Sequence, residues 1–248
     1  MTQANKSVKR RKLKIIAAIP CFDEEQFIGD VVTKARKHVD EVIVVDDGST
    51  DKTGWAASKA GARLITHKKR QGAGAATRSA FDAAKRCDAD VLITLDGDGQ
   101  HNPDEIPQLL APILCGKADL VVGSRFLGQD SEKAPRYRKF GIDVITWLYN
   151  VGSRFKLSDS QSCFRAYTRR LIEAMNITED GFGFSVQLLI HARSKGFVIT
   201  ETPVSCIYHS NGSTINPVSH GLGVALSVIR LRCRNKVLPK KKGTGERI

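Results

Sequence analysis

Apolar residues along the first half of the chain alternate between short runs and longer segments with helical spacing. The short runs are rich in β-branched residues, are apolar on both faces and are bounded by glycine or aspartate, which predicts buried strands. These predicted strands are residues 13–19, 41–45, 63–66, 91–95 and 119–122. The segments with helical spacing are residues 25–38, 53–60, 75–87 and 106–114. Repeated strand–helix units predict an α/β fold with a mostly parallel sheet and helices on both faces.

Polar residues follow four of these predicted strands directly. The four segments are residues 20–24 (PCFDE), 46–49 (DDGS), 96–100 (DGDGQ) and 123–125 (GSR). The carboxyl ends of parallel strands meet at one edge of a sheet, and ligands bind beyond that edge. We therefore expect the functional site where these four segments converge.

Asp96 and Asp98 are separated by one residue, so both carboxylates can face the same opening, and Gln100 adds another oxygen donor. Mg²⁺ and Mn²⁺ prefer oxygen ligands. Two aspartates in a glycine-rich turn are also common as turn formers. Two neighbouring like charges are costly without a cation, which favours a metal site.

Two other segments are open to a structural and a functional interpretation. Asp46 and Asp47 either start the next helix or accept hydrogen bonds from the ribose or base of a nucleotide. The small-residue turn at Gly72 either lets backbone N–H groups approach a diphosphate or allows close helix packing. No Ser–His–Asp arrangement is visible in the sequence.

Three arginines follow the predicted sheet, namely Arg125, Arg136 and Arg138, and the last two lie in a polar, turn-like stretch over residues 131–139. Guanidinium groups match phosphate oxygens well, although most surface arginines are only solvated charges.

Basic residues concentrate at the two ends of the chain. Of its 248 residues, 39 are Lys or Arg and 26 are Asp or Glu, which gives a net charge of +13. Residues 1–14 hold six basic and no acidic residues, and residues 230–248 hold eight basic residues and Glu246. The tails carry the whole excess, and the body between them is neutral. We expect basic tails that touch an anionic surface, and no nucleic-acid partner.

The cysteines and the hydropathy pattern bear on the compartment. Six dispersed cysteines without a CxxC pair favour a reducing, intracellular environment. No apolar run is long enough for a signal peptide or a membrane span, so we expect a chain without a span of its own and a possible membrane-spanning partner.

Five segments together resemble the family 2 glycosyltransferases, and within them the polyprenyl-phosphate sugar transferases that act on dolichyl phosphate. The resemblance extends over about residues 15–236. The matching segments are residues 19–25 (IPCFDEE), 45–51 (VDDGSTD), 96–101 (DGDGQH), 123–126 (GSRF) and 159–167 (DSQSCFRAY).

The resemblance implies a Rossmann-like GT-A fold. It also implies transfer of a sugar from a nucleotide diphosphate, such as a UDP- or GDP-sugar, to a polyprenyl phosphate, with inversion at the anomeric carbon. Residues matching the nucleotide site are Pro20, Phe22, Glu24, Asp46, Asp47, Gly72 and Asp96. Asp96, Asp98 and Gln100 match the site for Mg²⁺ or Mn²⁺, with Asp98 and Arg125 in catalytic positions. Arg125, Arg136 and Arg138 match groups at the acceptor phosphate.

The chain departs from the family pattern at four positions. Cys163 stands where glycine is usual, Arg70 and Asp23 where asparagine is usual, and Gln187 where glutamate is common. A phosphate acceptor is already anionic at neutral pH and needs no general base, whereas a hydroxyl acceptor does. Gln187 cannot act as a base, which favours the phosphate acceptor. Cys163 is expected to strain a turn that prefers glycine.

The sequence predicts three regions. Residues 1–14 form a basic tail, residues 15–217 a catalytic domain, and residues 218–248 an amphipathic helix with a basic tail at the cytoplasmic face of a membrane. Each basic residue near an anionic bilayer contributes about 1 kcal/mol. The alternative for residues 218–231 is an ordinary helix packed on the domain.

Two other enzyme classes compete. A family 2 enzyme with a hydroxyl acceptor would need a carboxylate base, for which Asp159 is the candidate. A sugar nucleotidyltransferase would share the nucleotide-binding sheet and acidic metal ligands. The sequence does not identify the sugar.

Overall fold

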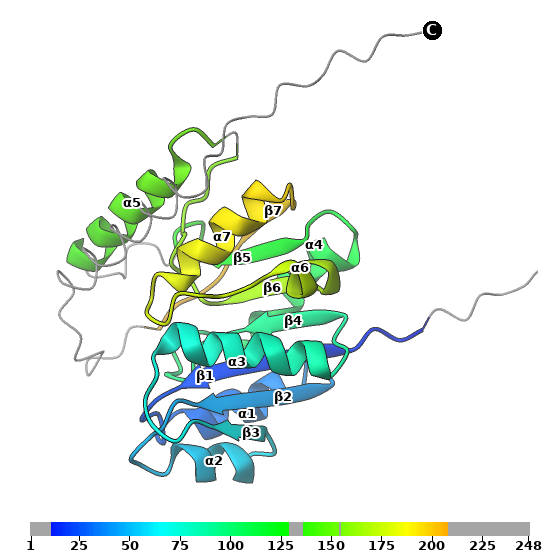
Figure 1. Cartoon of the computed structure of the whole chain (residues 1–248), viewed down its shortest axis with the longest axis vertical. Helices are drawn as coiled ribbons and strands as arrows, with labels where there is room; N and C mark the ends of the chain where they lie inside the picture. The colour runs from blue at the N-terminus through cyan, green and yellow to red at the C-terminus, as the bar shows by residue number, and fades with distance from the viewer. Residues whose placement is uncertain (1–10, 129–135, 154, 208–248) are drawn as a thin grey trace, which may run out of the picture.

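The part of the chain that the structure describes contains seven strands and seven α-helices, which alternate along most of its length (Figure 1). The computed structural model describes residues 11–128, 136–153 and 155–207. The strands are β1 (Ile15–Cys21), β2 (Glu41–Asp46), β3 (Arg63–Thr66), β4 (Val91–Thr94), β5 (Leu120–Ser124), β6 (Arg165–Thr168) and β7 (Ile199–Pro203). The helices are α1 (Ile28–Ala35), α2 (Thr53–Lys59), α3 (Ala73–Arg86), the 3₁₀ turn η1 (Pro103–Glu105), α4 (Ile106–Leu114), α5 (Arg136–Asn150), α6 (Arg169–Ala174) and α7 (Phe184–Ser194).

The strands form one sheet in the order β3-β2-β1-β4-β6-β5-β7. All neighbours are parallel except at β6, which runs antiparallel to both β4 and β5. The strand order reverses direction between β1 and β4, and such a reversal opens a crevice at the carboxyl ends of the strands. The expected mostly parallel sheet is confirmed.

Helices cover both faces of the sheet. Alternate residues of β1 point to opposite faces, so Ile16 and Ala18 belong to one core, while Ala17 and Ile19 belong to the other. The first core contains residues of α3, α6 and α7, and the second contains residues of α1, α2 and α4. All four of these β1 side chains are 0% exposed, because both faces of a parallel sheet must be buried.

The second half of the chain differs most from the sequence-based prediction. The polar stretch over residues 131–139, expected to be turn-like, contains the start of α5 at Arg136. Further along α5, Ile145 and Tyr149 lie four residues apart and are buried, which explains a helix there. The prediction did not include β6, β7, α6 or α7. β6 is four residues long and begins with an arginine, so it lacks the apolar run by which a strand is recognised.

The register of the strands aligns the expected site segments at one edge. Cys21 of β1 pairs with Asp46 of β2, and Asp46 pairs with Thr66 of β3. The residues that follow these strands therefore emerge side by side. Because β6 is antiparallel, the residues before it reach the same edge: Arg165 pairs with both Thr94 and Val122.

No helix in the described part of the chain is long and apolar enough to cross a membrane. The amphipathic segment expected at 218–231 and the two outermost tails lie outside the described residues.

Candidate active site

The turn after β1 is tied to the turn after β2 by a series of hydrogen bonds. The backbone N–H of Asp23 donates to Ser49 Oγ at 3.0 Å, and that of Glu24 donates to Thr53 Oγ1 at 2.7 Å. Asp23 Oδ1 in turn accepts from the N–H of Thr50 at 2.8 Å. Asp23 has a φ of 55°, a conformation in which Asn and Asp are enriched, which explains why an aspartate can replace the usual asparagine.

Asp46 and Asp47 are both buried, at 5% and 3% exposure. Asp46 Oδ1 accepts from the N–H of Ser49, which shapes the turn. Asp47 accepts from His67 Nδ1 at 2.7 Å and from the N–H groups of Gln71 and Gly72 at 2.9 and 2.7 Å. The Asp47 carboxylate is thus directed at the segment after β3, and this geometry corresponds to a structural anchor rather than to the expected nucleoside contact.

Close packing accounts for the glycines at the start of α3. The Gly72 N–H donates to Asp47, and the Gly74 N–H donates to the carbonyl of Asp180 at 2.7 Å. A Cβ at Gly74 would lie 2.0 Å from the Glu179 carbonyl oxygen, and one at Gly72 would lie 2.5 Å from that of Asp180. These N–H groups are already occupied, so the expected approach of the Gly72 N–H to a diphosphate is not supported by this structure.

A Ser–His–Asp line, which the sequence did not reveal, lies beside this turn. His67 Nδ1 contacts Asp47, and His67 Nε2 lies 2.9 Å from Ser79 Oγ on α3. His67 is only 10% exposed at its side chain, and Asp47 is shared with two backbone N–H groups. The line therefore fixes the 67–72 segment against α3.

Three carboxylates lie close together between β1 and β4. The pKa of Glu24 is raised to about 7, first by burial and then by the negative charges of Asp98 and Asp96. The pKa of Asp96 is also raised: its depth in the protein and Asp98 raise it, while His101 and Arg125 lower it. Even so, 41% of the Asp96 side chain is accessible. A cation would relieve this mutual repulsion.

The carboxylate cluster is not a complete metal site. Among the described residues, no group of three or more His, Cys, Asp or Glu side chains has metal-holding geometry. Asp98 Oδ1 accepts from the N–H of Gln100 at 3.0 Å, so one of its oxygens shapes the turn. Other ligands of a cation would have to come from water or from a bound diphosphate, as is usual for Mg²⁺.

His101 and Cys163 both contact Asp96 of this cluster. His101 is 4% exposed, lies 5.3 Å from the Phe164 ring, and its Nδ1 accepts from the N–H of Asp96 at 3.5 Å. Burial, and then Asp96, raise the pKa of the Cys163 thiol. Cys163 is not among the described residues with positive φ, so the expected backbone strain at this position is absent.

The guanidinium of Arg125, directly after β5, pairs with Asp159 at two points. Nε lies 2.7 Å from Oδ2 and Nη2 lies 3.0 Å from Oδ1. Burial opposes ionisation of Asp159 most strongly, but Arg125 and the N–H of Gln161 outweigh it, so the Asp159 pKa is lowered. Asp159 is 0% exposed and cannot serve as the general base of a hydroxyl acceptor.

The segment before β6 is held by side chains that the sequence did not single out. Arg165 is 1% exposed and donates to the carbonyls of Ser160, Ser162 and Ser185 and to Ser185 Oγ. Glu201 of β7 accepts from the N–H groups of Ser158 and Asp159. The contacts of Arg165 to Ser185 and of Glu201 to Ser158 and Asp159 span 20 to 43 residues, so the sequence carries no local signal for them.

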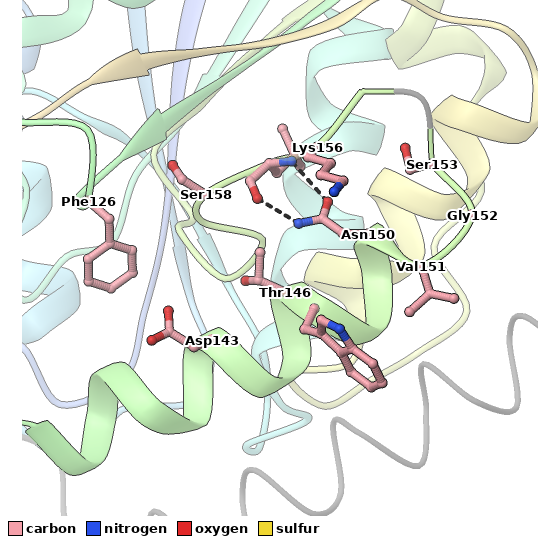
Figure 2. A pocket seen from close by; sticks show the side chains of 11 residues that line it. Phe126, Asp143, Thr146, Asn150, Val151, Gly152, Ser153, Lys156 and Ser158 are labelled. Atoms are coloured by element: carbon pink, nitrogen blue, oxygen red, sulfur yellow. Dashed lines mark hydrogen bonds between the residues drawn. The ribbon is translucent and has the colours of Figure 1, made fainter.

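Helix α5 and the segment after it enclose a pocket of about 490 Å³ (Figure 2). Asn150 Nδ2 donates to the Leu157 carbonyl at 2.8 Å and Asn150 Oδ1 accepts from the Leu157 N–H at 2.9 Å, which holds the segment against the helix. Phe126 and Ser158 line the pocket on the Arg125 side, and Ser158 Oγ lies 2.6 Å from Ser124 Oγ. The pocket therefore adjoins the end of β5.

One side of α5 exposes large apolar side chains. Phe140 is 71% exposed, Val144 39%, Trp147 65% and Val151, just after the helix, 44%. Their spacing of three or four residues places them in one row. Arg136 and Arg138 belong to α5, but their side chains lie outside the described residues.

Gln187 plays a structural role on α7. It is 1% exposed, its Oε1 accepts from the N–H groups of Thr178 and Glu179, and its Nε2 donates to Thr178 Oγ1 at 2.6 Å. The same segment continues to Asp180, which packs on Gly72 and Gly74. Gln187 thus holds the 178–180 segment, which in turn packs against the start of α3.

The root of the N-terminal tail lies at the opposite edge of the sheet. Arg11 Nη2 lies 3.2 Å from Asp90, Lys12 Nζ lies 2.6 Å from Asp40, and Lys14 Nζ donates to the Cys87 carbonyl. Asp40 and Asp90 precede β2 and β4, at their amino ends. These three basic residues at the root of the tail are therefore paired with groups of the folded body.

Comparison with known proteins places this geometry in a family. Residues 16–175 match the model of glycosyl transferase family 2. The UDP-N-acetylglucosamine–dolichyl-phosphate N-acetylglucosaminyltransferase of Methanococcus voltae is 28% identical over 215 residues, with 78% of this chain and 86% of the relative covered. The undecaprenyl-phosphate mannosyltransferase of Micrococcus luteus is 30% identical over 217 residues, with 82% and 87% covered.

A solved structure has a similar fold. Glucosyl-3-phosphoglycerate synthase of Mycobacterium tuberculosis, in complex with Mn²⁺, UDP and phosphoglyceric acid, superposes with a TM-score of 0.71 at 22% identity, covering 95% of this chain and 82% of that chain. The fold expected from the resemblance, a GT-A-like sheet with helices on both faces, is confirmed. The chain belongs to glycosyltransferase family 2.

Proposed function

We propose that this glycosyltransferase moves a hexose from a UDP- or GDP-sugar to a polyprenyl phosphate, with inversion at the anomeric carbon. The observation that carries the lipid acceptor is the exposed apolar row on α5 beside the end of β5 that bears Arg125. Relatives from two organisms are named for transfer to dolichyl and undecaprenyl phosphate, which supports the same acceptor class here.

The donor is assigned to the edge formed by β3, β2, β1 and β4. Phe22 follows β1, Asp46 is the last residue of β2, and Asp96 and Asp98 follow β4. Adjacent strands are about 4.8 Å apart, so three spacings cover roughly 14 Å, which suits a nucleoside at one end and a diphosphate at the other. Pro20 lies near the carboxyl end of β1, and Glu24 lies in the turn that follows it.

The carboxylate cluster fits a divalent cation. Asp98 and Asp96 would hold it together with Gln100. The pKa of Glu24 is raised first by burial and then by the negative charges of Asp98 and Asp96, which a cation would offset. When bound, Mg²⁺ or Mn²⁺ would neutralise the departing diphosphate. Diphosphate and carboxylates repel each other, so we expect the donor to bind together with the cation.

The acceptor is assigned to the space between Arg125 and α5. The pocket behind Phe126 and Ser158 joins the polar end of β5 to the apolar row on α5. A molecule with a phosphate at one end and a hydrocarbon chain at the other matches this arrangement, in which a polar region is followed by an apolar one. Arg125, held by Asp159, presents a fixed positive charge to the phosphate.

The chemistry of this end of the site favours a phosphate nucleophile. Two carboxylates close to the end of β5, Asp159 and Glu201, both accept hydrogen bonds from backbone N–H groups. A third, Asp143 of α5, lines the pocket and is exposed to solvent (Figure 2). A phosphate oxygen is already anionic and attacks the anomeric carbon directly from the face opposite the diphosphate. The new C–O bond forms as the bond to the diphosphate breaks, and the diphosphate leaves with the electron pair. The protein contributes position and charge.

The membrane surface is the proposed location. No disulfide joins the five cysteines in the described residues, which supports the cytoplasmic face. The 218–248 segment is proposed to add basic charge there, and a membrane-spanning partner would complete the assembly. If deletion of residues 218–248 left binding to anionic liposomes unchanged in low salt, this role of the tail would be wrong.

The test is incubation of the purified full-length protein with labelled UDP- and GDP-sugars, a polyprenyl phosphate and Mg²⁺ or Mn²⁺, followed by organic extraction. Label should enter the lipid phase, and EDTA should prevent it. Parallel reactions with the corresponding polyprenol, which has a hydroxyl in place of the phosphate, should remain unlabelled. Transfer to the polyprenol alone, or to neither lipid when a control enzyme succeeds, would contradict the proposal.

A further inference from the structure

A cation–π contact joins two loops at the nucleoside end of the edge. The guanidinium carbon of Arg70 lies 4.0 Å from the centre of the Phe22 ring. Phe22 follows β1 and is half-buried, whereas Arg70 follows β3 and is exposed. Within the described part of the chain, no hydrogen bond or ion pair engages the Arg70 guanidinium. Its N–H donors are therefore presented to solvent beside an aromatic ring.

The backbone at residue 70 is fixed by the end of β2. A Cβ at Gly48 would lie 2.7 Å from the Lys69 carbonyl carbon and 2.8 Å from the Arg70 nitrogen, so only glycine allows this approach. Gly48 also has a φ of +77°. On the other side, Asp47 holds the N–H groups of Gln71 and Gly72. Arg70 thus has an exposed side chain on a backbone that is fixed from both sides.

The Arg70 side chain offers only hydrogen-bond donors, so it can distinguish bases by the acceptors on their edges. An arginine offers a planar fork of donors and no acceptor, and it stacks readily on aromatic faces. Carbonyl oxygens on the edge of a base, as in uracil and guanine, can accept from such a fork. Adenine has no carbonyl oxygen. Its amino group, beside a ring nitrogen, is itself a donor and therefore repels the N–H donors of an arginine.

We propose that Arg70 determines the base specificity of the donor by donating to a carbonyl oxygen of the base, so that the site prefers uracil or guanine over adenine. This inference rests on the proposed nucleotide-sugar donor and deepens it. The asparagine usual at this position offers both a donor and an acceptor and would be less selective.

A purely structural role for Arg70 has a different consequence. If the guanidinium only covers Phe22 or adds positive charge near the diphosphate, its removal weakens the binding of every nucleoside diphosphate by the same factor. If it reads the base, its removal changes the ratio between bases. The discriminating quantity is therefore the ratio of dissociation constants.

The experiment is calorimetric titration of UDP, GDP and ADP, with Mg²⁺, into the full-length wild-type protein and the Arg70→Ala, Arg70→Lys and Lys69→Ala variants. The wild type should bind UDP or GDP about 5- to 150-fold more tightly than ADP, the range expected for one base-reading contact. Arg70→Ala should remove that preference, and the dissociation constant of ADP should stay within about twofold of its wild-type value. Arg70→Lys keeps the charge without the fork and should also lose the preference. Lys69→Ala, which removes a neighbouring exposed charge, should behave as wild type.

The outcomes separate the two levels of the inference. If all three nucleotides bind and Arg70→Ala leaves the ratio of their dissociation constants unchanged, the proposed role of Arg70 is wrong. The proposed function would then remain intact. Failure of the wild type to bind any of the three would overturn both. A thermal melt of each variant identifies loss of folding, and Arg70→Lys, the conservative variant, provides the second test should Arg70→Ala not fold.

Discussion

Asp159, which is fully buried, holds Arg125 at two points, with Nε–Oδ2 at 2.7 Å and Nη2–Oδ1 at 3.0 Å. The pair joins the end of β5 to the segment before β6, two parts of the chain that are 34 residues apart. It therefore both positions a charge for the acceptor and holds the acceptor half of the site together.

Removal of one partner of this pair should be strongly destabilising. Asp159→Ala leaves the Arg125 charge without its counter-ion and should lower the free energy of unfolding by about 3–5 kcal/mol, measured by urea denaturation. The exposed pair of Lys12 and Asp40 is the control, and Lys12→Ala should cost at most about 1 kcal/mol. Equal losses in the two variants would contradict the buried character of the Arg125–Asp159 pair.

Asp98→Ala should lower the rate of sugar transfer by roughly 10²- to 10³-fold, the loss typical of one electrostatic stabiliser. Its side chain is partly exposed, so the variant should fold normally. Glu173→Ala removes an exposed carboxylate from α6, which follows β6 and lies at the other edge of the sheet, and should leave the rate unchanged. Activity of Asp98→Ala within a few-fold of wild type would reject the metal assignment.

The raised pKa of Glu24 makes the stability of the metal-free protein depend on pH. Between the ordinary value of 4.5 and the folded value of about 7, the folded protein holds more protons at this site than the unfolded chain does. Its stabilising contribution is complete below pH 4.5 and is lost as the pH rises through 7.

Glu24→Gln removes this dependence. The difference in Tm between Glu24→Gln and wild type, followed in EDTA, should increase from pH 4.5 to 7 and then level off. Added Mg²⁺ should reduce the difference, because a cation offsets the repulsion that Glu24 feels from Asp96 and Asp98. A difference that is constant over the whole pH range would show that Glu24 does not titrate in this way.

Two helical glycines should respond oppositely to alanine. A Cβ at Gly74 would collide with the Glu179 carbonyl, whereas one at Gly29 on α1 has nothing within 4 Å. Gly74→Ala should destabilise by about 1–3 kcal/mol through overpacking, and Gly29→Ala should stabilise by about 0.5–1 kcal/mol through helix propensity. Denaturant unfolding of both variants provides the measurement. Stabilisation of Gly74→Ala would show that the 178–180 segment does not pack on α3 as described.

The apolar row on α5 should contribute to membrane binding. Replacement of both Phe140 and Trp147 by serine should weaken binding to anionic liposomes by roughly 10²- to 10⁴-fold, since burial of each such side chain contributes about 1.5–3 kcal/mol. Trp55→Ser is the matched control, because Trp55 is 62% exposed on α2 at the β3 end of the sheet. Liposome flotation in low and high salt separates the apolar contribution from the electrostatic one. Equal binding of the double variant and wild type would exclude this face of α5 from the interface.

Much of the donor half could be predicted from sequence, and less of the acceptor half. Strands β1, β2, β4 and β5 stand out because each is a short, mostly buried apolar run, and their carboxyl ends mark the edge where Asp46, Asp96 and Asp98 lie. The sequence could not show that Asp47 is engaged by His67 and backbone N–H groups, since those partners lie 20 to 25 residues away. Nor could it show Arg165, because a buried arginine that donates only to carbonyls and a serine hydroxyl carries no local pattern.

The antiparallel insertion of β6 between β4 and β5 determines the order in which the molecule can be assembled. β1 to β4 come from a continuous stretch that ends at Thr94, so this half of the sheet can form early as the chain leaves the ribosome. Until Arg165–Thr168 is available, the outer edge of β4 has unpaired backbone groups along a run of four buried residues, Val91–Thr94. Such an edge can pair with another chain. A newly made protein of this fold is therefore most exposed to aggregation during synthesis of the seventy or so residues between β4 and β6, and chains truncated within them should accumulate as insoluble material.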